Sequence, residues 1–173
     1  MRVVGLLRGV NLGPHRRLRM ADLRAVVESL GCTDVATYLQ SGNVVFNPPE
    51  GSGDDLGAEI SNELASALGL STNVQIRTGA EMAAIVAANP YDRPDPTRVV
   101  VTFCPTPPRP PDLDLAAFAP EGLTVHGREV YLDLPGGQAR SPLLAALAKA
   151  TPDDGRSTSR NWRTVLALAE MTR

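Results

Sequence analysis

The apolar positions at the start of the chain follow a strand pattern and then a helix pattern. Val3–Leu7 is a continuous apolar run, which is typical of a buried strand. A helical repeat of apolar residues comes next and ends at Gly31, since glycine is favoured just beyond a helix C-terminus. Its members are Leu23, Val26, Val27 and Leu30. We therefore expect a strand over 3–7 and a helix over about 21–30.

A hairpin and a second helix complete this pattern. Val35–Leu39 and Val44–Phe46 are short strand-like runs, and Gly42 between them permits the positive φ of a tight turn. A second helical repeat ends at Gly69 and consists of Leu56, Ile60, Leu64 and Leu68. Asn73–Arg77 then supplies another strand. The order β-α-β-β-α-β is that of a ferredoxin-like unit, with an antiparallel sheet and both helices on one face.

The second half repeats the same order less clearly. Strands are expected over 98–103, 123–126 and 129–134, and short helices over 113–118 and 142–150, the latter capped by Ser141. A final helix is expected from about Arg160 to Met171, so this half ends in a helix without a clear last strand. The fold class is α+β with two ferredoxin-like (βαββαβ-type) subdomains, over residues 1–78 and 79–173.

Composition and charge narrow the function classes. The chain has 173 residues, a net charge of −2 and two cysteines, Cys32 and Cys104, which do not make a disulfide framework. No segment approaches the roughly 20 apolar residues of a membrane span. We expect a cytoplasmic protein with no membrane partner, and the acidic balance argues against a broad nucleic-acid surface.

The first polar motif comprises Arg8, Gly9, Asn11 and Gly13, directly after the first strand. Its loop leads into a helix N-terminus, where free N–H groups and the helix dipole favour an anion such as phosphate. Further basic residues of the loop could add contacts to that anion; they are His15, Arg16, Arg17 and Arg19. The alternative is structural: the glycines shape a turn, the Asn11 side chain closes it, and the arginines are solvated.

The second motif comprises Gln40, Ser41, Gly42 and Asn43 in the expected hairpin. These residues carry more donors and acceptors than a hairpin needs, although such side chains often only close turns. We expect the first loop and this hairpin to lie at opposite ends of the sheet. A single site would then need the second half of the chain to join them.

The third motif comprises Arg160, Asn161, Trp162 and Arg163 at the start of the final helix. A preceding Ser or Thr would serve as the N-cap, and Trp162 lies on a helical apolar stripe that favours core packing. The other three offer planar donors at a helix N-terminus, which again suits an anion.

Taken in order, these motifs resemble those of the DUF1697 family of small bacterial proteins. The recurring elements occur here as Arg8–Gly13, Met20–Arg24, Tyr38–Val44 and Thr158–Val165. One departure is the segment 13–17, where relatives tend to carry Gly and Lys and this chain has Pro14, which stiffens the loop. The resemblance implies an α+β fold and no established activity or cofactor.

Three functional hypotheses follow from these patterns. The preferred one is binding of a small anionic ligand, phosphorylated or a nucleotide, by the Arg, Asn and Gly loops. The alternatives are an RNA-binding module, which the scarcity of aromatic residues disfavours, and a non-catalytic interaction or scaffold protein. Isolated histidines and cysteines predict no metal site and no cofactor. Catalysis and oligomeric state stay open.

Overall fold

The computed structural model describes residues 1–14 and 16–173, which form two compact units. The first unit comprises Met1–Ala83 together with Leu168–Arg173, and the second comprises Ala84–Ala167. Each unit contains one four-stranded antiparallel sheet. The return of the C-terminal residues to the first unit was not expected from the sequence.

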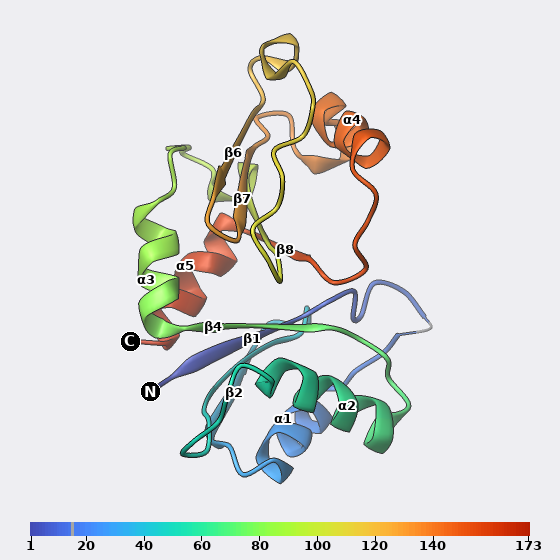
Figure 1. The fold of residues 1–173 in the computed structure, drawn as a ribbon, viewed down its shortest axis with the longest axis vertical. Helices are drawn as coiled ribbons and strands as arrows, with labels where there is room; N and C mark the ends of the chain where they lie inside the picture. Colours follow the sequence, from blue (N-terminus) through green and yellow to red (C-terminus); the bar gives the residue numbers. More distant parts are fainter. Residues whose placement is uncertain (15) are drawn as a thin grey trace. The chain divides into compact units, whose positions relative to one another are not determined.

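The first unit has the expected β-α-β-β-α-β order (Figure 1). Its elements are β1 (Val3–Leu7), α1 (Met20–Ser29), β2 (Thr33–Tyr38), β3 (Asn43–Asn47), α2 (Leu56–Leu68) and β4 (Val74–Thr78). The strands lie in the order β2-β3-β1-β4, and β1 is antiparallel to both of its neighbours. The ferredoxin-like arrangement predicted for this half is confirmed.

Both helices of the first unit pack on the same face of its sheet (Figure 1). Leu23 of α1 and Ile60 of α2 are fully buried against strand residues such as Phe46. Gly69 ends α2 with φ +65°, and the backbone N–H groups of Gly69 and Leu70 donate to the last-turn carbonyls of Ala65 and Leu64. The helical repeats read from the sequence therefore mark the core-facing sides of α1 and α2.

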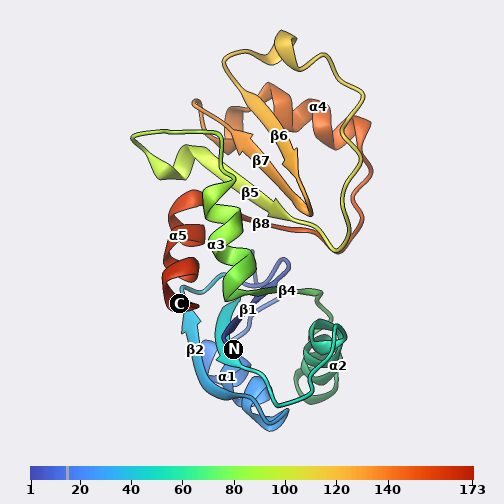
Figure 2. The same cartoon turned by 60° about the vertical axis from the view of Figure 1, so that its left-hand side comes forward.

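The second unit repeats this topology (Figure 2). Its elements are β5 (Val99–Phe103), the 3-10 helix η2 (Leu115–Phe118), β6 (Gly122–His126), β7 (Glu129–Asp133), α4 (Pro142–Ala150) and β8 (Thr158–Asn161), with short 3-10 turns η1 (Pro96–Arg98) and η3 (Gln138–Arg140). The strand order β6-β7-β5-β8 matches that of the first sheet. Two further helices, α3 (Gly79–Ala87) and α5 (Trp162–Met171), each have residues in both units.

The end of the second unit corrects one expectation. Thr158–Asn161 is a strand, so the expectation that this half lacks a clear last strand was wrong, while the predicted final helix is present as α5. This segment pairs with β5 in a regular register, with Arg160 opposite Val101 and Thr158 opposite Phe103. Its polar residues carry no apolar alternation, and the hydrogen-bond ladder with β5 determines their conformation instead.

The start of α4 follows the local capping rule. Ser141 Oγ accepts from the backbone N–H of Leu144 at 2.9 Å, which confirms the predicted cap of α4. Glu121 Oε2 reinforces it by accepting from Ser141 Oγ and from the N–H of Leu143, both at 2.9 Å.

Within residues 1–14 and 16–173, no helix is long and apolar enough to cross a membrane.

Candidate functional site

Three loops meet at one end of the first sheet, and we call this region the loop end. It comprises residues 8–14 and 16–19 after β1, 39–42 between β2 and β3, and 69–73 before β4. Because β1 and β2 are both antiparallel to β3, they run parallel and finish at the same edge. The expectation that the first loop and the hairpin lie at opposite ends was therefore wrong. Helix α1 carries the chain back along the sheet, so that β2 runs in the same direction as β1 and ends at the same end of the sheet.

Backbone hydrogen bonds join these three loops directly. The N–H of Leu7 donates to the carbonyl of Gly42 at 2.8 Å, and the N–H of Arg8 donates to the carbonyl of Asn73 at 2.9 Å. Thr72 Oγ1 then donates to the carbonyl of Arg8 at 2.7 Å. The first two predicted motifs thus belong to one cross-linked structure, without any contribution from the second unit.

Asn11 ties the first loop together. Its Nδ2 donates to the carbonyls of Leu18 at 2.9 Å and Gln40 at 2.6 Å, and its Oδ1 accepts from the N–H of Leu18 at 2.8 Å. The residue has φ +56°, a left-handed conformation that asparagine tolerates better than most residues. Both amide hydrogens of Asn11 are used within the fold, which favours the structural alternative for this residue.

Gly42 lets the hairpin approach the first loop. With φ +74°, an added Cβ would lie 2.6 Å from Val10 Cγ2 and 2.8 Å from Leu7 Cβ. No other residue fits this contact without displacing its neighbours. Gly9, also at positive φ, lies under Arg16, whose Nη1 would be 3.3 Å from an added Cβ, and Gly13 is exposed with nothing near it.

The remaining hairpin residues also serve the turn. Asn43 is fully buried, and its Nδ2 donates to the carbonyl of Tyr38 at 2.9 Å and to Ser41 Oγ at 3.0 Å. Gln40 has an exposed side chain, and its backbone carbonyl receives the bond from Asn11. Asn43 is therefore a turn-closing residue, as the structural alternative for this motif proposed.

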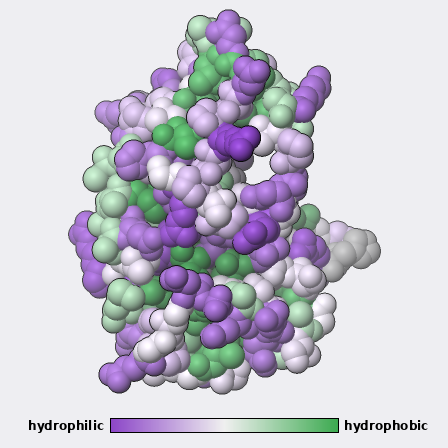
Figure 3. Space-filling view, in the orientation of Figure 1, coloured by the Kyte–Doolittle hydropathy of each residue, from purple (hydrophilic) through white to green (hydrophobic). Residues whose placement is uncertain are grey.

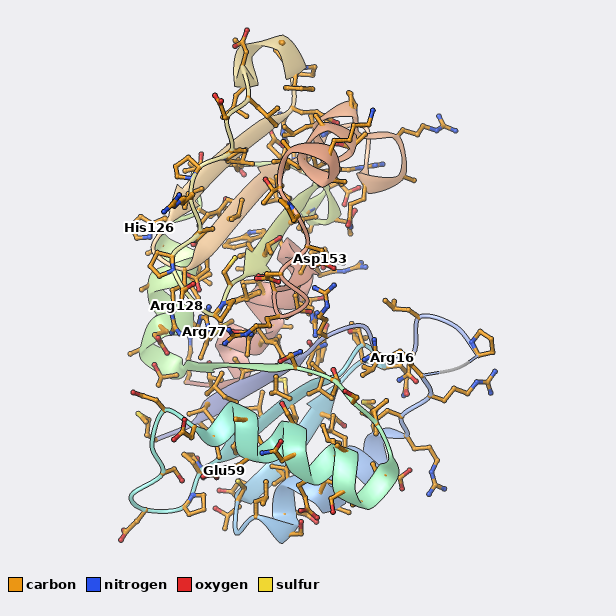
Figure 4. All side chains as sticks on the ribbon, turned by 45° about the vertical axis from the view of Figure 1, so that its right-hand side comes forward. Arg16, Glu59, Arg77, His126, Arg128 and Asp153 are labelled. Carbon is orange, nitrogen blue, oxygen red and sulfur yellow. The ribbon has the colours of Figure 1, made fainter. Side chains whose placement is uncertain are left out.

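The basic residues that followed the first motif in the sequence lie at the most accessible part of the loop end. Arg16 donates to the carbonyl of Ser71 and extends along the loop end in Figure 4. A depression of about 250 Å³ is lined by Arg16, Arg17, Leu18, Asp22, Leu68, Gly69 and Leu70. From the sequence, these arginines were expected only to add contacts to an anion. The local sequence does not distinguish an arginine that lines a depression from one that points into solvent. His15 of the same group lies outside the described residues.

Asp22 is the one carboxylate on this lining, and Arg19 neutralises it. The Nε and Nη2 of Arg19 donate to the two oxygens of Asp22, both at 2.7 Å. These hydrogen bonds hold the pKa of Asp22 below its ordinary value and raise that of Arg19. The N-terminus of α1 thus already has a paired carboxylate in its first turn, and Arg16 and Arg17 are the cations that face the depression.

Charge is segregated onto this end of the first unit. The three loops hold four arginines, Arg8, Arg16, Arg17 and Arg19, and none of the 19 acidic residues of the chain. The chain as a whole has a net charge of −2. A cationic end on an acidic protein attracts anions over the range of the Debye length.

The third motif belongs to the second unit and has mainly structural partners. Arg160 in β8 is only 8% exposed, its Nη1 donates to Thr158 Oγ1 and to the carbonyl of Ser159, both at 2.8 Å, and burial lowers its pKa to about 10. Asn161 Oδ1 accepts from the N–H of Thr164 at 2.9 Å, so Asn161 caps α5 in place of the expected Ser or Thr. Trp162 is half-buried and Arg163 is exposed.

The His, Cys, Asp and Glu side chains of residues 1–14 and 16–173 form no metal-binding cluster. No group of three or more His, Cys, Asp or Glu side chains in that part of the chain could hold an ion. Cys32 and Cys104 are buried free thiols, and burial raises the pKa of Cys32.

Comparison with known proteins agrees with the motif order. The family model described as "Protein of unknown function (DUF1697)" matches residues 1–131, about three quarters of the chain. The chain belongs to the DUF1697 family. Its fold is similar to that of the conserved bacterial protein SP0830 from Streptococcus pneumoniae, with a TM-score of 0.73, 21% identity and coverage of 99% of this chain and 97% of that one. No curated protein matches.

Proposed function

We propose that this DUF1697 protein binds a small anionic ligand, a phosphorylated metabolite or a nucleotide, at the loop end. The observation that carries the proposal is the depression lined by Arg16 and Arg17, in which the one carboxylate, Asp22, is paired with Arg19. Guanidinium groups form charge-assisted, often bidentate hydrogen bonds with phosphate. The ligand-contacting role thus falls on arginines, while Asn11, Gly42 and Asn43 hold the loops in place.

The ends of both helices at this site are compatible with an anion. The N-terminus of α1 has no side-chain cap hydrogen bond from Arg19, and its dipole favours negative charge. The carbonyls at the C-terminus of α2 would repel an anion, but those of Leu64 and Ala65 already accept backbone N–H groups. Arg16 and Arg17 supply the cationic donors of the depression.

Ligand-dependent stabilisation tests the proposal. Thermal unfolding is measured with inorganic phosphate, a sugar phosphate and ATP, at ionic strength matched with sodium chloride. A ligand at about 100 times its dissociation constant should add roughly 2.7 kcal/mol of stability. The Arg17→Ala variant should bind about tenfold or more weakly, since a charge-assisted hydrogen bond contributes about 1.5–3 kcal/mol.

A matched control separates this effect from a general loss of charge. Arg140 is also an exposed arginine, in the second unit, and Arg140→Ala should bind like the unmodified protein. The proposal fails if none of the phosphate compounds stabilises the protein. It also fails if Arg17→Ala and Arg140→Ala bind equally well.

A further inference from the structure

Exposed large apolar side chains gather at the loop end. Five such residues occur among the described residues: Met1, Leu12, Leu39, Leu68 and Leu166. Leu12 and Leu39 of this set lie on two of the segments that form the loop end, and Leu68 ends α2 directly before the third; they are 83%, 56% and 42% exposed. Elsewhere small apolar areas alternate with polar ones, as on the face in Figure 3, which is ordinary for a protein surface. The concentration of exposed leucines at the loop end therefore requires an explanation.

A hydrogen bond between their sequence neighbours connects the backbone segments of two of these leucines, Leu12 and Leu39. Asn11, next to Leu12, donates to the carbonyl of Gln40, which is next to Leu39. Leu39 itself has φ +58°, a left-handed backbone that disfavours leucine relative to glycine or asparagine. An exposed leucine in that conformation contributes nothing to the core, so its presence points to a use outside folding.

Leu12 and Leu39 are exposed outside the depression, whereas Leu68 lines it. Leu12 and Leu39 are absent from the lining of the depression, which contains Arg16 and Arg17. A bound peptide usually places its apolar side chains in a groove, whereas protruding aliphatic side chains beside arginines suit the interfacial region of a bilayer. The three loops contain no Phe, Tyr or Trp on which bases of RNA could stack.

We propose that the loop end docks on the surface of an anionic lipid bilayer, with Leu12 and Leu39 entering the interface and Arg16 and Arg17 contacting headgroup phosphates. This rests on the proposed function, because the same arginines bind the phosphate, here supplied by a phospholipid. Charge complementarity between Arg16 and Arg17, on loops that contain no acidic residue, and anionic lipid supports it. The expectation of no membrane partner rested on hydropathy along the sequence, which detects spanning segments and not surface loops.

Vesicle co-sedimentation tests the docking. The full chain is mixed with vesicles of phosphatidylcholine alone, or with vesicles in which about one third of the lipid is phosphatidylglycerol, whose negative charge attracts basic residues. We expect binding to the anionic vesicles, several-fold weaker binding to the neutral ones, and weakening by added salt. The double variant Leu12→Ser/Leu39→Ser should bind anionic vesicles at least several-fold more weakly.

The second unit offers a matched control for the apolar change. Leu166 of α5 is 41% exposed, and Leu166→Ser should bind vesicles like the unmodified protein. Circular dichroism and thermal unfolding verify that each variant is folded. If the double variant binds anionic vesicles as tightly as Leu166→Ser, insertion of the leucines is overturned.

Other results separate this inference from the function on which it rests. Stabilisation by free phosphate compounds without vesicle binding would overturn the bilayer and leave the anion site. Absence of both would overturn the two proposals together. Concentration-dependent self-association that the double variant abolishes, without vesicle binding, would identify a second copy of the chain as the occupant and overturn the bilayer.

Discussion

Asn11 shows how one side chain can determine the geometry of a candidate site without contacting a ligand. Its amide group bonds to Leu18 within its own loop and to Gln40 in the hairpin. From the sequence, an asparagine between two glycines suggested either a ligand contact or a turn. The partner at Gln40, 29 residues away, could be known only from the fold.

The hydrogen bonds of the Asn11 side chain should stabilise the folded protein. Asn11→Ala should lower the free energy of unfolding by about 2–3 kcal/mol, since it removes three hydrogen bonds that contribute about 1 kcal/mol each. Asn11→Asp keeps the acceptor but places a carboxylate oxygen against the carbonyls of Leu18 and Gln40, so it should not restore the lost stability. Urea denaturation measures both variants, and an Asn11→Ala protein as stable as the unmodified one would refute the assigned role.

Burial of Tyr131 should make the stability of the protein depend on pH in the alkaline range. It is fully buried, its hydroxyl donates to the carbonyl of Ile85 at 2.9 Å, and burial, assisted by Glu129, raises its pKa to about 12 from an ordinary 10. Below pH 10 the hydroxyl is neutral in the folded and unfolded chains. Between pH 10 and 12 only the unfolded chain releases the proton, so stability falls as the pH rises.

The stability difference between the unmodified protein and Tyr131→Phe should therefore be constant below pH 10. The free energy of unfolding of the unmodified protein should fall by about 2–3 kcal/mol relative to that of Tyr131→Phe as the pH approaches 12, because two pKa units correspond to about 2.7 kcal/mol. Urea denaturation of both proteins across this range measures the difference. A difference that does not change with pH would show that Tyr131 ionises as readily in the folded protein as in the unfolded chain.

At the scale of elements, the helical repeats and glycine stops of the first unit were predictable because they depend on neighbours within a few residues. Gly31 and Gly69 both have the positive φ expected after a helix. The strand β8 was not predictable in this way, because its conformation depends on pairing with β5, far away in the sequence. The meeting of the hairpin with the first loop likewise follows from strand direction, which no local pattern contains.

The contact between hairpin and loop gives a prediction for Gly42. Gly42→Ala combines a left-handed φ with Cβ contacts below 3.0 Å to Val10 and Leu7, and should cost about 3 kcal/mol or more. Gly51 has a similar φ of +80° with nothing near an added Cβ, so Gly51→Ala should cost only about 1 kcal/mol. Chemical denaturation of both variants isolates the packing contribution, and equal losses would contradict the close approach.

At the scale of the whole molecule, the chain enters the second unit through α3 and comes back to the first through α5. Leu168 is fully buried and Thr172 is 5% exposed, and both are grouped with the first unit. An added Cβ on Gly79 would lie 2.5 Å from the carbonyl oxygen of Thr172. The C-terminal residues are thus an integral part of the N-terminal unit.

Truncation after Ala167 should therefore destabilise the first unit. Loss of a buried leucine alone costs about 2–5 kcal/mol, and amide exchange in β1 and β4 should accelerate. Removal of Arg173 alone, which is exposed, serves as the control and should leave the exchange unchanged. Exchange rates in β1 and β4 that are the same with and without Leu168–Arg173 would contradict the assignment of this segment.

The sequence alone determined the α+β class, the repeated strand and helix order, the membership in the DUF1697 family and the presence of an arginine-rich loop, because each depends on residue identities and short spacings. Only the tertiary structure decided that the first two motifs meet, that Asn11 and Asn43 are structural, and that Arg16, Arg17 and the exposed leucines occupy one end. Strand direction and burial create those relations between residues far apart in the sequence.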